Sequence, residues 1–255
     1  MASRSEKRKA QLIDQVAEDV SKRVSGQDAK LAEKFARALY EHVPPDDILG
    51  ETAENLAGAA SAGWAFMRER RTDEPKIRVY NPEPERDGWM RPHTVVQIVN
   101  DDMPFLVDSI AIAANREGAE VLLVIHPIFG VERDDNGRLT ALGATDEFEL
   151  GVRSESFMLV YISEQPESRH KALEGLLSGV LADVRAAVDD WRPMRQRCRE
   201  IIRELEKAPP KLPREEVAEG VAFLEWFDDE HFTYLGYREY HFEGKGAKSV
   251  ARILP

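Results

Sequence analysis

The chain has 255 residues, of which 42% are hydrophobic and 32% charged, and its formal net charge at pH 7 is −12. This composition is typical of a globular protein, the negative charge disfavours a nucleic acid partner, and no apolar run approaches the roughly 18–20 residues that cross a bilayer. Because the single cysteine, Cys198, cannot form an internal disulfide and the N-terminus lacks the apolar core of a secretion signal, we expect a cytoplasmic protein.

Apolar residues recur every three or four positions through the first seventy residues, which predicts helices. The first helix is expected to end at residues 25–26 and the second just before Pro45, because Ser-Gly and Pro-Pro pairs interrupt the pattern. Pro45 suits the first turn of a third helix that runs to about Met67. Gly58 and Gly63 lie on the inner face of this helix, so another helix could approach it closely.

From residue 75 the pattern changes to short β-rich runs. Strands are expected at 77–80, 94–100, 121–133 and 156–163. The run at 94–100 is mostly apolar, as is typical of a central strand buried on both faces. Asp102 is expected to cap the following helix, which ends at Gly118. Pro127 predicts a bend in the third strand, and Asn136-Gly137 predicts a hairpin turn after it.

The segment 167–207 could form one long helix, but Pro193 argues against it, since a proline inside a helix costs about 3 kcal/mol. We therefore expect a helix over 167–181, a short strand over 183–188, and a new helix with Pro193 in its first turn. The order from 94 to 188 is then β-α-β-β-α-β. This is the ferredoxin-like pattern, in which two helices cover one face of an antiparallel sheet.

The C-terminal quarter is expected to contain an amphipathic helix over 191–207, a second helix over 212–231 and an aromatic strand over 232–242. The sequence thus predicts an α+β fold with N-terminal helices, a ferredoxin-like domain and C-terminal helices. The expected domains are a helical region (1–74), the ferredoxin-like domain (75–190), a helical connector (191–231) and the truncated start of a further β-containing domain (232–255).

Sequence signatures of catalysis are missing. There is no GxGxxG or GxxxxGK[ST] loop for a nucleotide, no GxSxG and no HExxH, and the six histidines are too scattered to suggest a metal site. Cys198 lies on the apolar face of its helix, where a thiol is inert. Paired acids such as Asp101 and Asp102 could suggest a self-standing enzyme, but neighbouring residues on a strand point apart. We expect no catalytic residue, metal or cofactor in this segment.

One polar loop could bind a ligand, and it joins the strand at 94–100 to the next helix. Its residues are Asn100, Asp101, Asp102, Met103, Pro104 and Phe105. Free N–H groups at a helix N-terminus can hold a carboxylate, while Asp101 or Asp102 could pair with an ammonium, so the loop suits an amino acid. The same residues are also explained as a plain helix cap, with Asp102 as acceptor and Pro104 in the first turn.

The run DMPFLVDSI resembles the first loop and helix of ACT domains, whose pattern is roughly D-x-P-G-L-L-x-x-I. The matching positions are Asp102, Pro104, Leu106, Val107 and Ile110. Two longer runs, TVVQIVNDDMPFLVDSI and FLEWFDDEHFTYLGYREY, resemble the N-terminal part of the large bacterial NAD-specific glutamate dehydrogenases. This likeness covers about residues 30–245.

The resemblance implies an ACT-like domain in a very long chain whose catalytic domain lies far downstream. The expected role is that of a non-catalytic regulatory or assembly segment. Its expected partners are the downstream catalytic domain and other copies of the chain, and the full enzyme would use NAD to deaminate glutamate oxidatively to 2-oxoglutarate. Phe105 replaces the glycine of the ACT pattern, and its ring would fill space that a ligand needs. An amino-acid effector bound at residues 100–105 is the alternative function.

Overall fold

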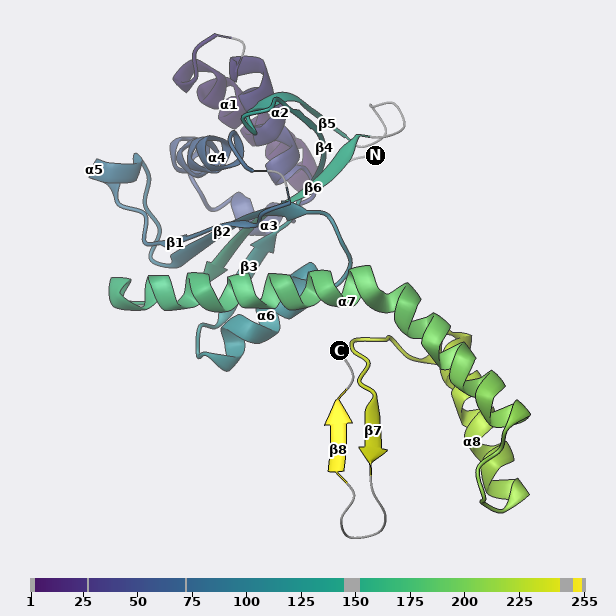
Figure 1. The fold of residues 1–255 in the computed structure, drawn as a ribbon. Coiled ribbons are helices and arrows are strands. Elements are labelled where there is room, and N and C mark those ends of the chain that lie inside the picture. Colours follow the sequence, from purple (N-terminus) through teal and green to yellow (C-terminus); the bar gives the residue numbers. More distant parts are fainter. Residues whose placement is uncertain (1–2, 27, 72, 145–151, 244–249, 254–255) are drawn as a thin grey trace. The chain divides into compact units, whose positions relative to one another are not determined.

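The computed structural model describes residues 3–26, 28–71, 73–144, 152–243 and 250–253 (Figure 1). The chain divides into two compact units, residues 1–182 and residues 183–255. The fold class predicted from the sequence, α+β with N-terminal helices, an ACT-like sheet domain and C-terminal helices, is confirmed. The division of the chain into four domains stays a prediction.

The first unit begins with helices. They are α1 (Arg4–Arg23), α2 (Asp28–Glu41), α3 (Pro45–Ile48) and α4 (Ala53–Met67). The predicted break after α1 is confirmed, and Gly26 has a φ of +72° there. The third predicted helix is divided, because Thr52 begins a new helix by accepting a hydrogen bond from the Asn55 N–H at 3.2 Å.

The glycine face of α4 is closely approached, as expected. A Cβ on Gly58 would overlap the Cβ of Trp89, and a Cβ on Gly63 would lie 3.0 Å from the ring of Phe157. The approaching groups are a loop residue at Gly58 and, at Gly63, both the sheet and the predicted second helix, since the Phe35 ring of α2 lies 3.2 Å from the same Cβ position. Both glycines therefore allow α4 to pack directly against the sheet domain.

Six antiparallel strands form the sheet. They are β1 (Lys76–Tyr80), β2 (Thr94–Asp101), β3 (Val121–Ile125), β4 (Ile128–Arg133), β5 (Leu139–Gly143) and β6 (Arg153–Ile162). Their order is β1-β2-β6-β4-β5, and β3 also pairs with β6. β3 and β4 follow successive halves of β6, since Val121–Ile125 pairs with its last residues and Ile128–Val131 with its first. The bend expected at Pro127 separates these two strands.

The strand predicted over 183–188 is wrong, because these residues belong to α7 (Glu167–Lys207), a single helix of 41 residues that contains Pro193. The buried side chains Leu177, Leu181 and Val184 continue one helical face across the predicted strand. In the ferredoxin-like order a fourth strand lies beside the first. Here β1, which precedes β2 in the chain, takes that position, so the sheet keeps the ACT-like arrangement with an edge strand of different origin.

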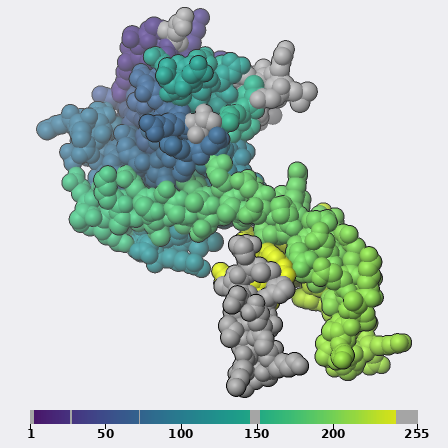
Figure 2. Space-filling view, viewed as in Figure 1, coloured from purple at the N-terminus to yellow at the C-terminus, as the bar shows by residue number. Residues whose placement is uncertain are grey.

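Helices cover both faces of the sheet (Figure 1). α1, α2 and α4 lie on one side, where their buried residues share a core with Phe157 and Tyr161 of β6. α6 (Leu106–Arg116) and the part of α7 that belongs to this unit, residues 167–182, lie on the other side, and this part of α7 is the start of the green band in Figure 2. Residues 94–100 of β2 are all buried, which confirms the predicted central strand. α5 (Pro84–Asp87) lies in the loop between β1 and β2.

The second unit contains the rest of α7, α8 (Arg214–Trp226), η2 (Phe227–His231), β7 (Tyr240–Glu243) and β8 (Val250–Ile253). The strand predicted over 232–242 is largely wrong, since only 240–243 form a strand, paired with β8. The preceding aromatic residues pack on Phe227 instead, with ring centroids 4.8 Å away for Phe232 and 5.0 Å for Tyr234. Among the described residues, no helix has the length and apolar character to span a membrane.

Replacing Pro193 with alanine is expected to stabilise the chain by about 1–3 kcal/mol, because alanine restores the helical hydrogen bond and removes the clash of the ring. Urea unfolding followed by circular dichroism measures the change. Pro213 precedes the first turn of α8, so Pro213→Ala serves as the control and should leave stability nearly unchanged. A neutral or destabilising Pro193→Ala would support the first-turn position that the sequence suggested.

Candidate functional site

The loop predicted to bind a ligand lies between β2 and α6. The structure brings its six residues together at the end of a central strand, beside Ser154 and Ser156 of β6. Asn100 is buried, and its amide donates to the backbone oxygen of Asp101 at 3.0 Å. Met103 is half-buried, whereas Pro104 and Phe105 are exposed. The residues are therefore clustered as expected, but their polar groups already have partners.

Asp102 does not cap α6, so that prediction is wrong. Its carboxylate accepts a hydrogen bond from Ser156 Oγ at 2.6 Å, and its N–H donates to the Ser154 oxygen at 2.9 Å. These bonds tie Asp102 to β6, four residues before α6 begins at Leu106. The position before the first helical residue is occupied by Phe105, which makes no side-chain capping bond.

Phe105 adopts a left-handed backbone conformation with a φ of +72°. This is the region that glycine favours, and a side chain there costs roughly 1–2 kcal/mol. The chain thus keeps the backbone shape of the ACT pattern while replacing its glycine. The side chain is 46% exposed. Strain of this kind persists where the surrounding structure enforces it, and it concentrates at binding sites.

A buried ion network lies beneath the loop. Arg70 Nη1 is 2.9 Å from Asp101 Oδ1 and 2.9 Å from Glu155 Oε1. Arg133 donates two hydrogen bonds to the same Glu155 carboxylate, from Nε to Oε1 at 2.9 Å and from Nη2 to Oε2 at 2.7 Å. The side chains of Arg70 and Glu155 are each 1% exposed. Two arginines and two carboxylates balance in charge, so the network is electrically neutral.

The two arginines of the network also donate hydrogen bonds to nearby backbone oxygens. Arg70 Nε donates to the Glu74 oxygen at 2.8 Å, and Arg133 donates to the oxygens of Gly137 and Met67 at 2.8 and 3.1 Å. The network therefore joins the end of α4, the end of β2, the hairpin after β4 and the start of β6. Sequence reasoning missed it, because its members lie far apart in the chain. The charged residue Glu155 at the start of a buried strand is the signal that points to such a partner.

The ion pair changes what the loop can bind. An ammonium group that approached Asp101 would compete with Arg70, which is already held in a buried position. Removing one partner of such a pair leaves an uncompensated buried charge, which costs several kcal/mol. Asp101 therefore acts first as a structural residue. Asp102 accepts a hydrogen bond from Ser156. It could bind a ligand only if that hydrogen bond were exchanged for one to the ligand.

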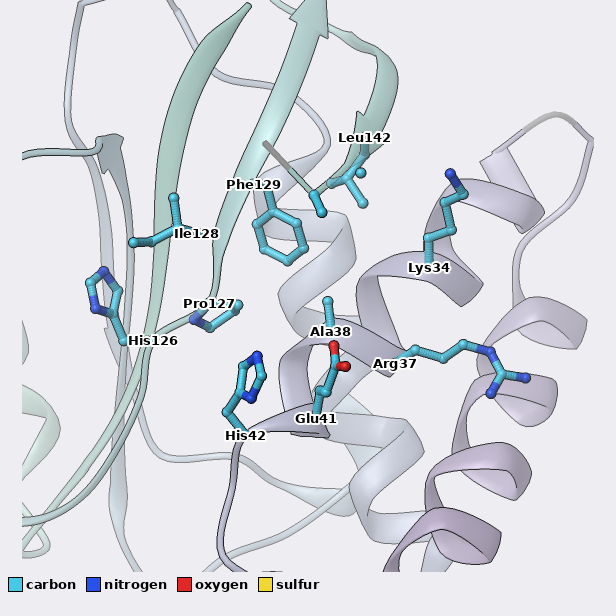
Figure 3. Close-up of a pocket in the computed structure, with 12 residues that line it drawn as sticks. Lys34, Arg37, Ala38, Glu41, His42, His126, Pro127, Ile128, Phe129 and Leu142 are labelled. Carbon is cyan, nitrogen blue, oxygen red and sulfur yellow. The ribbon is translucent and has the colours of Figure 1, made fainter. Parts of the chain in front are cut away.

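A separate cavity of about 450 Å³ lies between α2 and the edge formed by β4 and β5 (Figure 3). Its charged and polar lining includes Lys34, Arg37, Glu41, His42 and His126. Burial lowers the pKa of His126, and the nearby Asp102 carboxylate opposes that shift. The sequence offered no signal for this cavity, because α2 and the β3–β4 bend are about 85 residues apart in the chain. Within the described ranges no group of three or more potential metal ligands is present.

The family model for the glutamate dehydrogenase ACT1 domain matches residues 35–177, which is more than half of the chain. The chain belongs to this ACT1 family. It is similar to the NAD-specific glutamate dehydrogenase of Halomonas elongata, with 32% identity over 97% of this chain and 16% of the relative. The corresponding protein of Pseudomonas aeruginosa is 34% identical over 81% of the chain and 13% of the relative. The corresponding protein of Mycobacterium tuberculosis is 29% identical over 69% of the chain and 11% of the relative.

The family match confirms the resemblance found in the sequence, and it begins well before residue 75, where the ACT-like domain was predicted to start. The matched ACT1 region starts within α2 and ends within α7, so it includes α4 and the whole six-stranded sheet. It therefore contains the 100–105 loop, the ion network and the residues that line the cavity, apart from Lys34. The chain spans less than a fifth of the length of each of these three relatives.

Replacing Glu155 with alanine is expected to destabilise the chain by about 3–5 kcal/mol, because both Arg70 and Arg133 would keep buried charges with no partner at that site. Chemical denaturation measures the free energy of unfolding. The matched control is Arg153→Ala, two residues away on β6, which removes an exposed pair with Asp73 and should cost less than about 1 kcal/mol. Equal losses for the two variants would contradict a structural role for the network.

Proposed function

We propose that this chain is a non-catalytic regulatory or assembly segment in the N-terminal part of an NAD-specific glutamate dehydrogenase. The full enzyme would convert L-glutamate, NAD⁺ and water into 2-oxoglutarate, ammonium, NADH and a proton in the cytoplasm. The observation that carries the proposal is the ACT1 match over residues 35–177. NAD binding and hydride transfer are assigned to another part of the enzyme, so the residues described here would act on structure or on regulation.

Exposed apolar side chains of the second unit support an assembly role. Phe223 is 55% exposed, Trp226 46% and Phe232 51%, and the Trp226 ring contacts both phenylalanine rings. Large exposed apolar groups gathered in this way mark surfaces that contact other protein. We assign this surface, defined by these three residues, to the downstream catalytic domain of the same chain. Pairing between copies of the chain would use other surfaces of a homo-oligomer.

The isolated 255-residue chain is expected to form no NADH from L-glutamate and NAD⁺, because catalysis belongs to the rest of the enzyme. Absorbance at 340 nm measures the reaction. The full-length dehydrogenase of Pseudomonas aeruginosa, assayed in the same cuvette conditions, is the positive control. Turnover by the isolated chain that remains after further purification would contradict the proposed division of labour.

An amino-acid sensor is the second candidate function. The observation that favours it is the strained loop, in which Phe105 keeps a glycine-like backbone conformation next to Asp102. An amino acid would place its carboxylate on the N–H groups that begin α6 and its ammonium near Asp102. The engagement of Asp101 with Arg70 weighs against this candidate, so assembly remains our first proposal.

If the loop is a sensor, one amino acid should selectively raise the unfolding temperature. A ligand at a hundred times its dissociation constant adds about 2.7 kcal/mol. Asp102→Asn should abolish the shift, whereas Asp108→Asn, an exposed acid in the first turn of α6, should keep it. Unchanged melting curves for all the common amino acids would contradict a sensor and leave assembly as the function.

A further inference from the structure

The cavity between α2 and β4 has the size and the polarity of a ligand site. Its volume of about 450 Å³ lies within the roughly 300–1,000 Å³ of small-molecule pockets. One wall is apolar: Pro127, Ile128 and Ala38 line it with accessible side chains, whereas Phe129 and Leu142 are nearly fully buried (Figure 3). On the helix side, Glu41 and His42 extend into it from the end of α2. Apolar and polar groups are therefore separated within one space.

Glu41 is placed where it opposes the stability of its own helix. It is the last residue of α2, and the last turn of that helix carries no basic residue. A helix C-terminus bears a partial negative charge, so an acid there is unfavourable and a cation is favoured. Within the part of the chain that the structure describes, the Glu41 carboxylate has no ionic or hydrogen-bonding partner. The end of α2 thus presents both a helix terminus and a carboxylate to a cation.

The other charges of the cavity leave this attraction in place. Arg37 is turned towards α1, where it pairs with Asp14, and it also pairs with Glu33 at 3.0 Å. Lys34 lies seven residues before Glu41, about 10 Å along the helix axis, at the far end of the cavity (Figure 3). His126 stays neutral at pH 7, because burial lowers its pKa. Arg37 and Lys34 are therefore directed away from the Glu41 carboxylate, whereas Lys9 lies at the same helix end and contacts the Glu41 backbone oxygen.

The chain already holds one ammonium at this helix end. Lys9 Nζ donates to the backbone oxygen of Glu41 at 2.5 Å, and Lys9 is only 8% exposed. This contact lies on the side of Glu41 that faces α1 and uses the backbone, not the carboxylate. The C-terminus of α2 thus accepts an ammonium through its backbone oxygen, and the Glu41 carboxylate is left to pair with a cation in the cavity.

We propose that this cavity binds a small molecule with an ammonium group on an apolar body. The ammonium would pair with the Glu41 carboxylate and donate to the His42 imidazole, while the apolar body would cover Pro127, Ile128 and Ala38. An alkyl amine and an apolar amino acid share this chemistry, and the experiment distinguishes them. The site is on the opposite face of the sheet from α6, and it does not depend on the proposed dehydrogenase role.

Isothermal titration calorimetry of the 255-residue chain tests the proposal with four probes of similar size. Pentylamine and leucine carry the ammonium, whereas pentanoate and 1-pentanol lack it. Saturable one-to-one binding is expected for at least one ammonium probe and for neither of the other two. Binding of pentylamine alone identifies an amine ligand, and tighter binding of leucine identifies an amino acid. Equal binding of pentanoate or pentanol, or no binding of any probe, would overturn the proposal.

Three variants locate the binding. Glu41→Gln should weaken binding at least tenfold, or about 1.4 kcal/mol, because it removes the charge and keeps the shape. Asp47→Asn on α3 removes an equal charge outside the cavity and should leave binding unchanged. Ala38→Leu fills the cavity and should abolish binding in a chain that still unfolds cooperatively. Leucine binding that is lost in Asp102→Asn but kept in Glu41→Gln would overturn this site and support the loop as a sensor.

Discussion

The buried carboxylate of Glu155 is the constraint on which the sheet domain depends. It lies at the start of the central strand β6 with almost no access to water, so it is tolerated only because Arg70 and Arg133 both pair with it. Those arginines come from the segment after α4 and from β4, and their remaining donors fasten neighbouring backbone oxygens. One charge thus draws together elements that lie far apart in the sequence, and the apolar core alone would not specify their alignment.

The position of the 100–105 loop follows from this network. Asp101 ends β2 and shares Arg70 with Glu155, while Asp102 is held by Ser156, the residue after Glu155. The loop is therefore anchored on two sides before α6 begins, and the left-handed backbone at Phe105 completes the turn into the helix. A rigid loop of this kind can support an interface or orient a bound group. Its acids serve the fold first, which is why assembly is favoured over sensing.

The sequence predicted the elements whose signal is local. The strand at 94–100 is apolar throughout, and Gly118 ends α6 with a φ of +74°, as its place after the helix suggested. The strand at 183–188 was wrong because Val184 fits an alternating pattern and a helical face equally well. The cost of a proline inside a helix then argued against one continuous helix, although α7 contains Pro193 at an exposed position. The predicted strand over 183–188 took the edge position beside β2, and β1 occupies that position in the structure.

The site was predicted in part. Residues 100–105 were correctly placed together between strand and helix, but the partners of Asp101 and Asp102 lie 31 positions before and 54 positions after them. Neither local spacing nor composition carries information at that range, because sheet register and core packing decide such contacts. The same reason hides the cavity, whose walls come from α2 and from the β3–β4 bend. Both features emerge only from the folded arrangement.

The most direct test of the proposed role compares the full-length dehydrogenase that carries this segment with a form that lacks residues 1–255. Sedimentation velocity measures the assembly, and steady-state kinetics measures turnover of glutamate per catalytic domain. The shortened enzyme is expected to keep its turnover but to lose the native assembly or its regulation. An enzyme that retains its native sedimentation coefficient and loses all turnover would contradict a non-catalytic role for this segment.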